Sequence, residues 1–229
     1  MIPLRDSTRS RSFPYVTIAI IIINLFVYFL QFTSNQSGLE NIILNYALIP
    51  ARFTEQLLTY PLTGFLHLPL VTSVFLHGGW FHVLFNMLYL WIFGDNIEDR
   101  LGHTRFLLFY ILAGIAGNLT HIILHSGSPI PLVGASGAIA GVLGAYFITF
   151  PRAKITSLFF IVFIIFIREI PAIYFLLFWF ILQLVNGLTS LGIMGNTVAW
   201  WAHIGGFLVG ILLMMLLKKK DRWSYNNLP

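Results

Sequence analysis

The segment Gly134–Gly137 (Gly-Ala-Ser-Gly) places one hydroxyl, that of Ser136, in a turn of small residues that leads into an apolar run. Glycines beside a serine leave its oxygen uncrowded and let other backbone approach closely, as at a turn-to-helix junction that presents a nucleophile. Serine is also a common helix cap, so a purely structural role for Ser136 is equally open. A base and an oxyanion donor at the same membrane depth would favour the nucleophile.

Three other polar residues are candidates for that base and that donor. His82 and Asn86 are four residues apart near the start of an apolar run, which places them one turn apart on one face of a helix. His203 lies near the start of the last apolar run. Each has a structural alternative, since histidine and asparagine in membrane helices often bond neighbouring helices together. Such groups are costly in a membrane and are usually functional or bonded to one another.

The composition indicates the class of protein that carries these residues. Of the 229 residues, 58% are hydrophobic and 9% are charged, and the mean hydropathy is +0.84, whereas a soluble domain has about a quarter of its residues charged. We therefore expect a polytopic membrane protein. The absence of cysteine excludes disulfides and cysteine chemistry. The net charge of +5 follows from membrane orientation and gives no reason to expect a nucleic-acid partner.

Six apolar segments are predicted to span the bilayer as helices within a single domain over residues 1–229. The fourth, 136–150, is the shortest, which suits a helix that begins below the membrane surface inside a protein-lined cavity. The connection over residues 33–79 is broken by three prolines and is predicted to form short interfacial helices. The predicted spans are about 14–32, 80–95, 106–124, 136–150, 171–187 and 198–217.

The positive charges set the expected orientation. With six spans and the N-terminus inside, twelve Lys and Arg residues lie on the inner side and only Arg52 lies on the outer side. A seventh span would place Lys218–Lys220 outside, so Ile155–Ile167 is predicted to lie along the inner surface. We expect an integral protein of a prokaryotic plasma membrane with both termini in the cytoplasm. No cleavable signal is evident, because no small-residue cleavage site follows the apolar run after Arg11.

Small residues on the fourth and last spans favour contact between Ser136 and His203. The fourth span carries Gly137-x-x-x-Gly141, and the last carries Gly206-x-x-x-Gly210. Small residues at this spacing let two helix backbones come unusually close. That approach would allow a hydroxyl–imidazole hydrogen bond of about 2.6–3.2 Å.

Four motifs follow one another along the chain: His82-x-x-x-Asn86, Gly94-x-x-x-Glu98-x-x-x-Gly102, Gly134-Ala135-Ser136-Gly137 and Ala202-His203-x-x-Gly206-x-x-x-Gly210. Together, and in this order, they resemble the motifs of the rhomboid family of intramembrane serine proteases. The resemblance covers nearly the whole chain and implies an all-α membrane protein, a six-helix rhomboid bundle with a long interfacial first loop. The family's Trp-Arg pair in that loop is not evident, since residues 65–69 read Phe-Leu-His-Leu-Pro.

The resemblance also implies residue roles. It makes Ser136 the nucleophile and His203 the general base, and it forms the oxyanion hole from His82, Asn86 and the Ser136 backbone N–H. The implied reaction is hydrolysis of peptide bonds in single-span transmembrane proteins, within the lipid bilayer near its outer leaflet, with no cofactor and no metal. We expect no acidic residue within the spans to orient His203, so the mechanism would lack the third member of a triad.

Other functions compete with this interpretation. His121 and His125 have a zinc-like i, i+4 spacing, but the pattern His-Glu-x-x-His is absent. All four aspartates are expected at the inner face or beyond, which disfavours an aspartyl protease. A catalytically silent rhomboid-like protein that binds transmembrane helices stays the main alternative, and a small transporter is disfavoured because no internal repeat is found. Glu98 and Arg100 are interpreted as structural pairing at the inner end of the second span.

Overall fold

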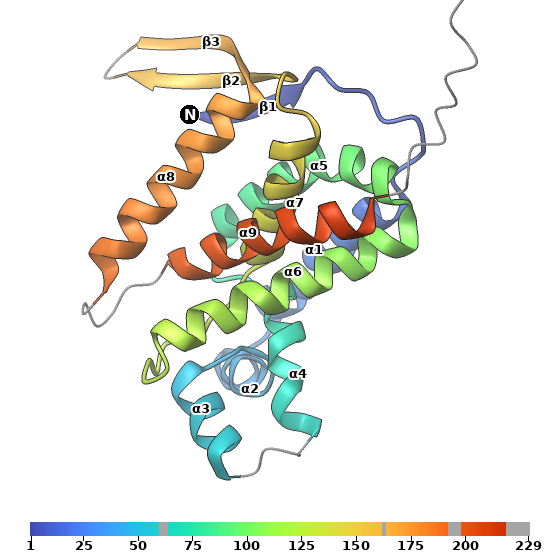
Figure 1. The fold of residues 1–229 in the computed structure, drawn as a ribbon. Coiled ribbons are helices and arrows are strands. Elements are labelled where there is room, and N and C mark those ends of the chain that lie inside the picture. The colour runs from blue at the N-terminus through green and yellow to red at the C-terminus, as the bar shows by residue number, and fades with distance from the viewer. Residues whose placement is uncertain (60–63, 162–163, 192–197, 219–229) are drawn as a thin grey trace, which may run out of the picture.

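The computed structural model describes residues 1–59, 64–161, 164–191 and 198–218. Most of these residues are helical. Figure 1 shows a bundle with α7 in its interior, α8 at one side and the strands at one end. The helices of the bundle are α1 (Tyr15–Thr33), α5 (Trp80–Leu101), α6 (His103–Leu124), α7 (Ser136–Thr149), α8 (Ala172–Ser190) and α9 (Trp200–Leu217).

The connection between α1 and α5 folds into short helices, as the prolines in its sequence predict. These are α2 (Gln36–Tyr46), α3 (Pro50–Thr59), α4 (Gly64–Thr72) and the 3₁₀ turn η1 (Ser73–Phe75). In Figure 1 they lie at the end of the bundle opposite the strands. Asn35 caps α2, because its side chain accepts the Gly38 N–H at 2.8 Å. Their interfacial position stays a prediction.

The six bundle helices lie over the six apolar segments of the sequence, and six crossings stay a prediction because length and composition support fewer. Among the described helices, α1, α6, α8 and α9 are long and apolar enough to cross a membrane. The segment His67–Phe75 and α5 are long and apolar enough for a membrane span only when they are taken together, and their axes are bent by 88° relative to each other. α5 also continues to Leu101, well beyond its predicted end at Asp95. α7 has 14 residues, or about 21 Å of helix, against an apolar bilayer core of about 30 Å.

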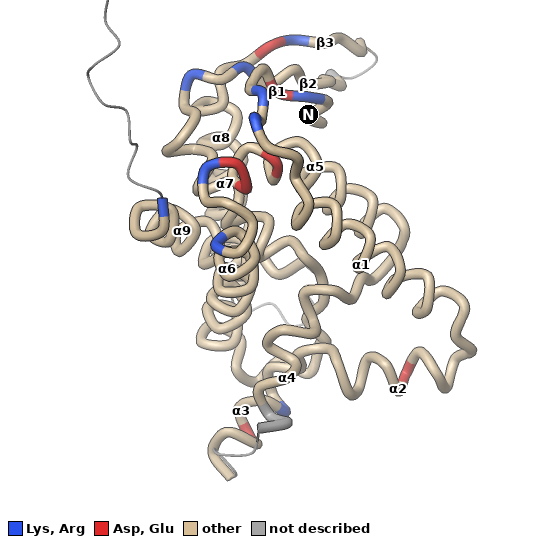
Figure 2. The backbone as a smooth tube through the Cα atoms, turned by 90° about the vertical axis from the view of Figure 1, so that its right-hand side faces the viewer, with Lys and Arg blue, Asp and Glu red and all other residues tan. Residues whose placement is uncertain are grey.

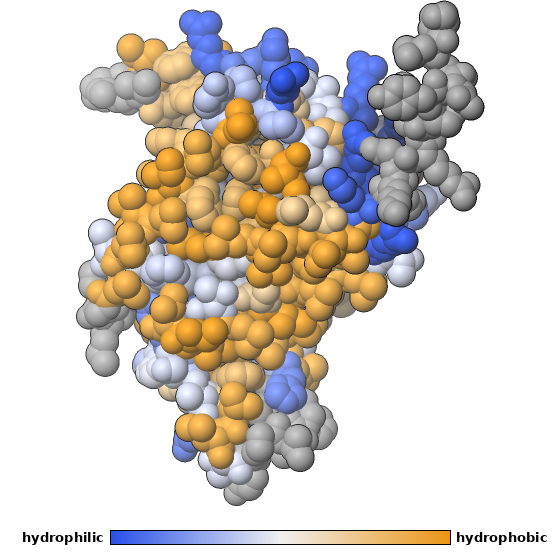
Figure 3. Space-filling model, in the orientation of Figure 1, coloured by the Kyte–Doolittle hydropathy of each residue, from blue (hydrophilic) through white to orange (hydrophobic). Residues whose placement is uncertain are grey.

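Protein rather than lipid surrounds most of α7. Every residue from Gly137 to Tyr146 is buried, and the helix packs against α5, α6 and α9. Figure 3 shows that the face of the bundle in view is broadly apolar, as lipid-facing helices require. A helix whose neighbours cover it has no need of the full apolar length that lipid exposure demands. This explains why a short helix occupies the centre of the bundle.

Glu98 joins the C-terminal end of α5 to the start of α1. Its buried carboxylate accepts the backbone N–H groups of Val16 at 2.9 Å and of Thr17 at 2.7 Å, and the Thr17 hydroxyl at 2.7 Å. It also lies 2.5 Å from His103 Nδ1. The first turn of a helix leaves its N–H groups unpaired and carries a partial positive charge. The carboxylate therefore caps α1 from a neighbouring helix.

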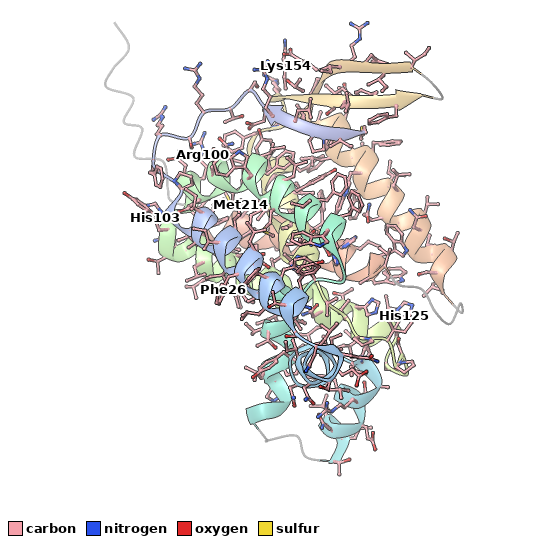
Figure 4. The ribbon with its side chains drawn as sticks, turned by 180° about the vertical axis from the view of Figure 1, so that it is seen from behind. Phe26, Arg100, His103, His125, Lys154 and Met214 are labelled. Atoms are coloured by element: carbon pink, nitrogen blue, oxygen red, sulfur yellow. The ribbon has the colours of Figure 1, made fainter. Side chains whose placement is uncertain are left out.

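The glycines on either side of Glu98 serve the same junction. A Cβ on Gly94 would lie 3.1 Å from the Thr17 side chain, so the missing side chain lets α1 approach α5. Gly102 ends α5 with a positive φ of 79°. Arg100 lies 5.0 Å above the Phe150 ring and does not pair with Glu98, which corrects the expectation that the two form one inner-end pair. Figure 4 places Arg100 at the end of the bundle near the strands.

We expect Glu98→Ala to lower the free energy of unfolding by about 3 kcal/mol, because it leaves buried N–H groups of α1 without an acceptor. The measurement is thermal unfolding of the purified protein in detergent. Asp99→Ala is the matched control, since the Asp99 carboxylate bonds Ser12 in an exposed position. A Glu98 variant as stable as the Asp99 variant would contradict the capping role.

The mostly helical structure is consistent with the all-α expectation, and a small antiparallel sheet that was not predicted lies at one end of the bundle. Its order is β1 (Ile2–Asp6), β2 (Lys154–Ile161), β3 (Ile164–Pro171), with Asp6 opposite Ile155 in the first pair. Of the segment Ile155–Ile167, predicted to lie along the inner surface, residues 155–161 belong to β2 and residues 164–167 to β3, and Figure 1 shows these two strands projecting beyond the helices. Phe159 and Phe166 stack across the strands with ring centroids 5.2 Å apart. β-branched and aromatic residues of this kind favour strands.

Candidate active site

Ser136 and His203 meet where the first residue of α7 faces the first turn of α9. Ser136 Oγ lies 2.8 Å from His203 Nε2, within hydrogen-bond distance. The cap position of α7 belongs to Ala135, and no side-chain cap bond is formed there. The Ser136 hydroxyl is therefore used in the contact with the imidazole and does not cap the helix.

Backbone contact between α7 and α9 makes this approach possible. A Cβ on Gly206 would lie 2.0 Å from the Gly137 carbonyl oxygen, and one on Gly210 would lie 2.2 Å from the Gly141 carbonyl oxygen. No side chain fits at either position without moving a backbone. The prediction that small residues bring these two helices together is confirmed. The serine and the histidine lie where both helices begin, at the N-terminal end of the contact between α7 and α9.

Gly134 shapes the turn before Ser136. Its φ of +127° lies in a region that favours glycine, and a Cβ there would lie 2.7 Å from His82 Nε2. The Gly134 N–H donates to the Ser73 carbonyl at 2.9 Å, which ties the turn to η1. Conformation and space both require glycine at this position. The turn therefore passes directly beside the His82 ring.

His82 presents an N–H group toward this turn. The Gly78 backbone N–H donates to His82 Nδ1 at 3.3 Å, so in the neutral ring the proton is carried by Nε2. The ring of His77 packs edge-on against His82 with centroids 5.0 Å apart. Gln31 on α1 holds the His77 backbone by two hydrogen bonds, of 3.0 and 3.2 Å. The loop before α5 thus fixes which nitrogen of His82 donates.

Asn86 supplies a second donor beside the same turn. The side chain is 8% exposed, and its buried Nδ2 has no hydrogen-bond partner within the described part of the chain. Nδ2 lies 3.7 Å from the position of a Cβ on Gly134. The Ser136 N–H is a third donor, since the first residue of a helix has no intrahelical acceptor. Three donors therefore surround one side of the turn, an arrangement able to hold a negatively charged oxygen.

The other nitrogen of His203 contacts a residue that the sequence analysis did not select. Gln183 on α8, 5% exposed, places Oε1 2.8 Å from His203 Nδ1. The Trp179 ring lies face-tilted and the Trp200 ring edge-on to the imidazole, with centroids 6.0 and 6.1 Å away. Gln183 was not predicted because the sequence-based expectation considered only an acidic partner for His203. The available signal was that Gln183 is one of two amide side chains, with Asn186, in an otherwise apolar fifth span.

The two histidines with zinc-like spacing lie at the C-terminal end of α6. The His121 and His125 rings stack with centroids 4.7 Å apart and planes 10° apart. In Figure 4, His125 lies at the opposite end of the bundle from Arg100 and His103. Among the described residues, no group of three or more His, Cys, Asp or Glu side chains could hold a metal ion. The pair offers two ligands, fewer than a protein zinc site uses.

The chain matches known proteins over much of its length. Residues 66–220 match the family model of the rhomboid domain. RHOMBOID-like protein 5 of Arabidopsis thaliana is 31% identical over 69% of this chain and 46% of its own length. The Bacillus subtilis rhomboid protease GluP is 47% identical over 33% of this chain and 14% of its own. Rhomboid protein 1, mitochondrial, of Saccharomyces cerevisiae is 29% identical over 66% and 42%. The chain spans less than half the length of these relatives.

Proposed function

Because this chain belongs to the rhomboid family, we propose that it is an intramembrane serine endopeptidase that hydrolyses peptide bonds of single-span transmembrane proteins. The observation that carries the proposal is the 2.8 Å contact between Ser136 Oγ and His203 Nε2. A nucleophile within hydrogen-bond reach of a base is the arrangement that acyl transfer needs. The name of the GluP relative, a rhomboid protease, supports the same activity.

In the proposed first step, Ser136 attacks the scissile carbonyl. His203 Nε2 takes the hydroxyl proton as Oγ bonds to the carbonyl carbon, and the C=O electron pair moves onto oxygen. The oxyanion is then held by Asn86 Nδ2, His82 Nε2–H and the Ser136 N–H. The unpartnered Asn86 donor supports this role, because a buried N–H group without an acceptor is costly unless a ligand satisfies it.

The intermediate then collapses and releases the new amine. The C–N bond breaks as the imidazolium of His203 gives its proton to the leaving nitrogen, which leaves an acyl ester on Ser136. Water, deprotonated by the same imidazole, attacks that ester, and the proton returns to Ser136 Oγ as the ester breaks. No step in this sequence draws on a cofactor.

Covalent labelling tests the proposal directly. The full-length protein in liposomes is treated with a fluorescent fluorophosphonate, and a reconstituted single-span substrate is assayed for cleavage in parallel. We expect labelling of the parent and none of Ser136→Ala. A folded parent that neither labels nor cleaves would contradict the protease and favour the alternative, a rhomboid-like protein that binds transmembrane helices without cleaving them.

We further propose a plasma-membrane protein of a single domain with six crossings and both termini in the cytoplasm. Figure 2 shows most of the charged residues gathered at the strand end of the bundle, with few on α2 and α3. The pairing of β1 with β2 joins the N-terminal segment to the hairpin at that same end. Both observations support an inner location for the hairpin. Lys219, Lys220 and Arg222, which the charge argument also used, lie outside the described residues.

Single cysteines can test this orientation, because the chain contains none of its own. We expect Arg52→Cys, on α3, to react with an impermeant maleimide added to intact cells. Arg168→Cys, on β3, is expected to react only after the membrane is permeabilised. The two positions are matched, since both carry exposed arginines in the structure. Labelling of Arg168→Cys from outside would contradict the orientation.

A further inference from the structure

We propose that Gln183 is the positioning residue that fixes the tautomer of His203, in place of the carboxylate of a serine-protease triad. The inference rests on the proposed protease function. It corrects the expectation of a base with no orienting partner. The evidence is a continuous series of hydrogen bonds that starts at Ser136 and ends on α8.

The series consists of three contacts. Ser136 Oγ lies 2.8 Å from His203 Nε2, and His203 Nδ1 lies 2.8 Å from Gln183 Oε1. Gln183 Nε2 donates to the Trp179 backbone carbonyl at 3.1 Å. Both ends of the Gln183 amide are therefore engaged, and the side chain is 5% exposed. A buried amide that is bonded at both ends holds a single orientation.

The carbonyl of Trp179 sets the direction of the whole series. A carbonyl oxygen can only accept, so the amide nitrogen of Gln183 must face it. The amide oxygen is then left to face His203, and it can only accept as well. His203 must therefore carry its proton on Nδ1, which leaves the lone pair of Nε2 free for the Ser136 proton. This is the tautomer that a general base requires.

The opposite orientation of the amide is chemically unfavourable. Rotating the Gln183 side-chain amide by 180° would bring Oε1 against the Trp179 carbonyl, two acceptors in contact. It would also turn an N–H donor toward His203 Nδ1 and move the imidazole proton to Nε2. An Nε2–H group cannot take a proton from Ser136. The backbone of α8 thus excludes the unproductive tautomer.

The surroundings of His203 offer no rival partner among the described residues. The titratable groups that act on it electrostatically are His82 on α5 and His121 on α6. Neither forms a hydrogen bond with the imidazole, whose two nitrogens are engaged by Ser136 and Gln183. Trp179 and Trp200 contact its ring faces and edges only. Gln183 is therefore the group that selects the protonated nitrogen.

The test compares two variants of Gln183 in the full-length protein in liposomes. Gln183→Met keeps the unbranched shape and loses the acceptor, and we expect kcat to fall roughly tenfold to hundredfold with KM nearly unchanged. Gln183→Glu restores an acceptor at the same place, and we expect it to recover most of that loss. Asn186→Leu is the matched control on the same helix, since the side chain of Asn186 bonds only the Leu182 carbonyl among the described residues. It is expected to leave kcat unchanged.

Nitrogen NMR of the imidazole provides a readout that does not depend on turnover. With labelled histidine, and His203→Ala to assign the signal, we expect Nδ1 to be protonated in the parent and Nδ1 and Nε2 to share the proton in Gln183→Met. The inference would be overturned if Nδ1 of His203 proved unprotonated in the parent protein. It would also be overturned if Gln183→Met left both kcat and the tautomer of His203 unchanged. If the parent proves inactive, the protease proposal fails, yet the NMR result still decides the role of Gln183.

Discussion

Replacement of Ser136 by Ala is expected to abolish peptide-bond cleavage, with a fall of at least about 10⁴-fold in kcat/KM, while the protein stays folded. The change removes one oxygen atom and leaves the backbone of α7 in place. No other serine or threonine in α7 precedes Thr149, so no substitute nucleophile lies nearby. His203→Ala is expected to have an effect of the same order, because the hydroxyl then lacks a base. The measurement is cleavage of a single-span substrate in liposomes.

Folding must be checked for the histidine variant in particular. His203 contacts Ser136, Gln183, Trp179 and Trp200, so its removal also disturbs packing at the start of α9. Thermal unfolding and size-exclusion profiles close to those of the parent would separate the chemical loss from a structural one. Turnover at the parent level by a purified, folded Ser136→Ala protein would rule out the dyad.

The second large effect is expected at the oxyanion donors. Asn86→Ala and His82→Ala should each slow turnover by roughly 10- to 10³-fold without eliminating it, and the double variant should be slower than either. The tetrahedral intermediate places a negative charge in a site with little water, where a preorganised donor counts for more than in bulk water. Losing one donor leaves two. Steady-state kinetics on one substrate would give the fall in kcat directly.

Controls for these variants come from the same helix. Leu84→Ala changes an exposed apolar side chain of α5 and is expected to keep the parent kcat. His82→Ala also needs a stability measurement, because the ring accepts the Gly78 N–H and packs on His77. Should the two single variants and the double variant all turn over at the parent rate, the i, i+4 pair would serve only to hold helices together.

Much of the bundle was predictable because lipid-facing helices leave long apolar runs in a sequence. The bounds of α1, α8 and α9 agree closely with the predicted spans. The site residues were predictable for a related reason, since a polar side chain in such a run is costly and therefore conspicuous. The unusual glycines before and after Ser136 gave a further signal. Close packing of α7 on α9 could be read from Gly206 and Gly210.

The hairpin was not predictable by the same argument. A continuous apolar run of moderate length is compatible with a helix and with a buried or membrane-facing strand, because periodicity is absent in both. What distinguishes them here is the partner strand β1, more than a hundred residues earlier in the chain. A strand partner at that distance in the sequence cannot be recognised from the local pattern of residues. Gln183 was not predicted because only an acidic partner was considered for His203. The oxygen of an amide can accept the imidazole N–H as a carboxylate can.

The hydrogen bonds between β1 and β2 also constrain how often the chain crosses the bilayer. Bonded strands must lie on one side, so the chain between Asp6 and Lys154 has to cross an even number of times. α1, α6 and the bent segment ending in α5 supply three candidates, and α7 is the remaining bundle helix in that stretch. If those three candidates all cross, an even total needs a fourth crossing, and this supports the proposal that α7 crosses the bilayer despite its length. The pairing of the five-residue strand β1 thus bears on the number of membrane crossings, which the hydropathy of α7 alone does not indicate.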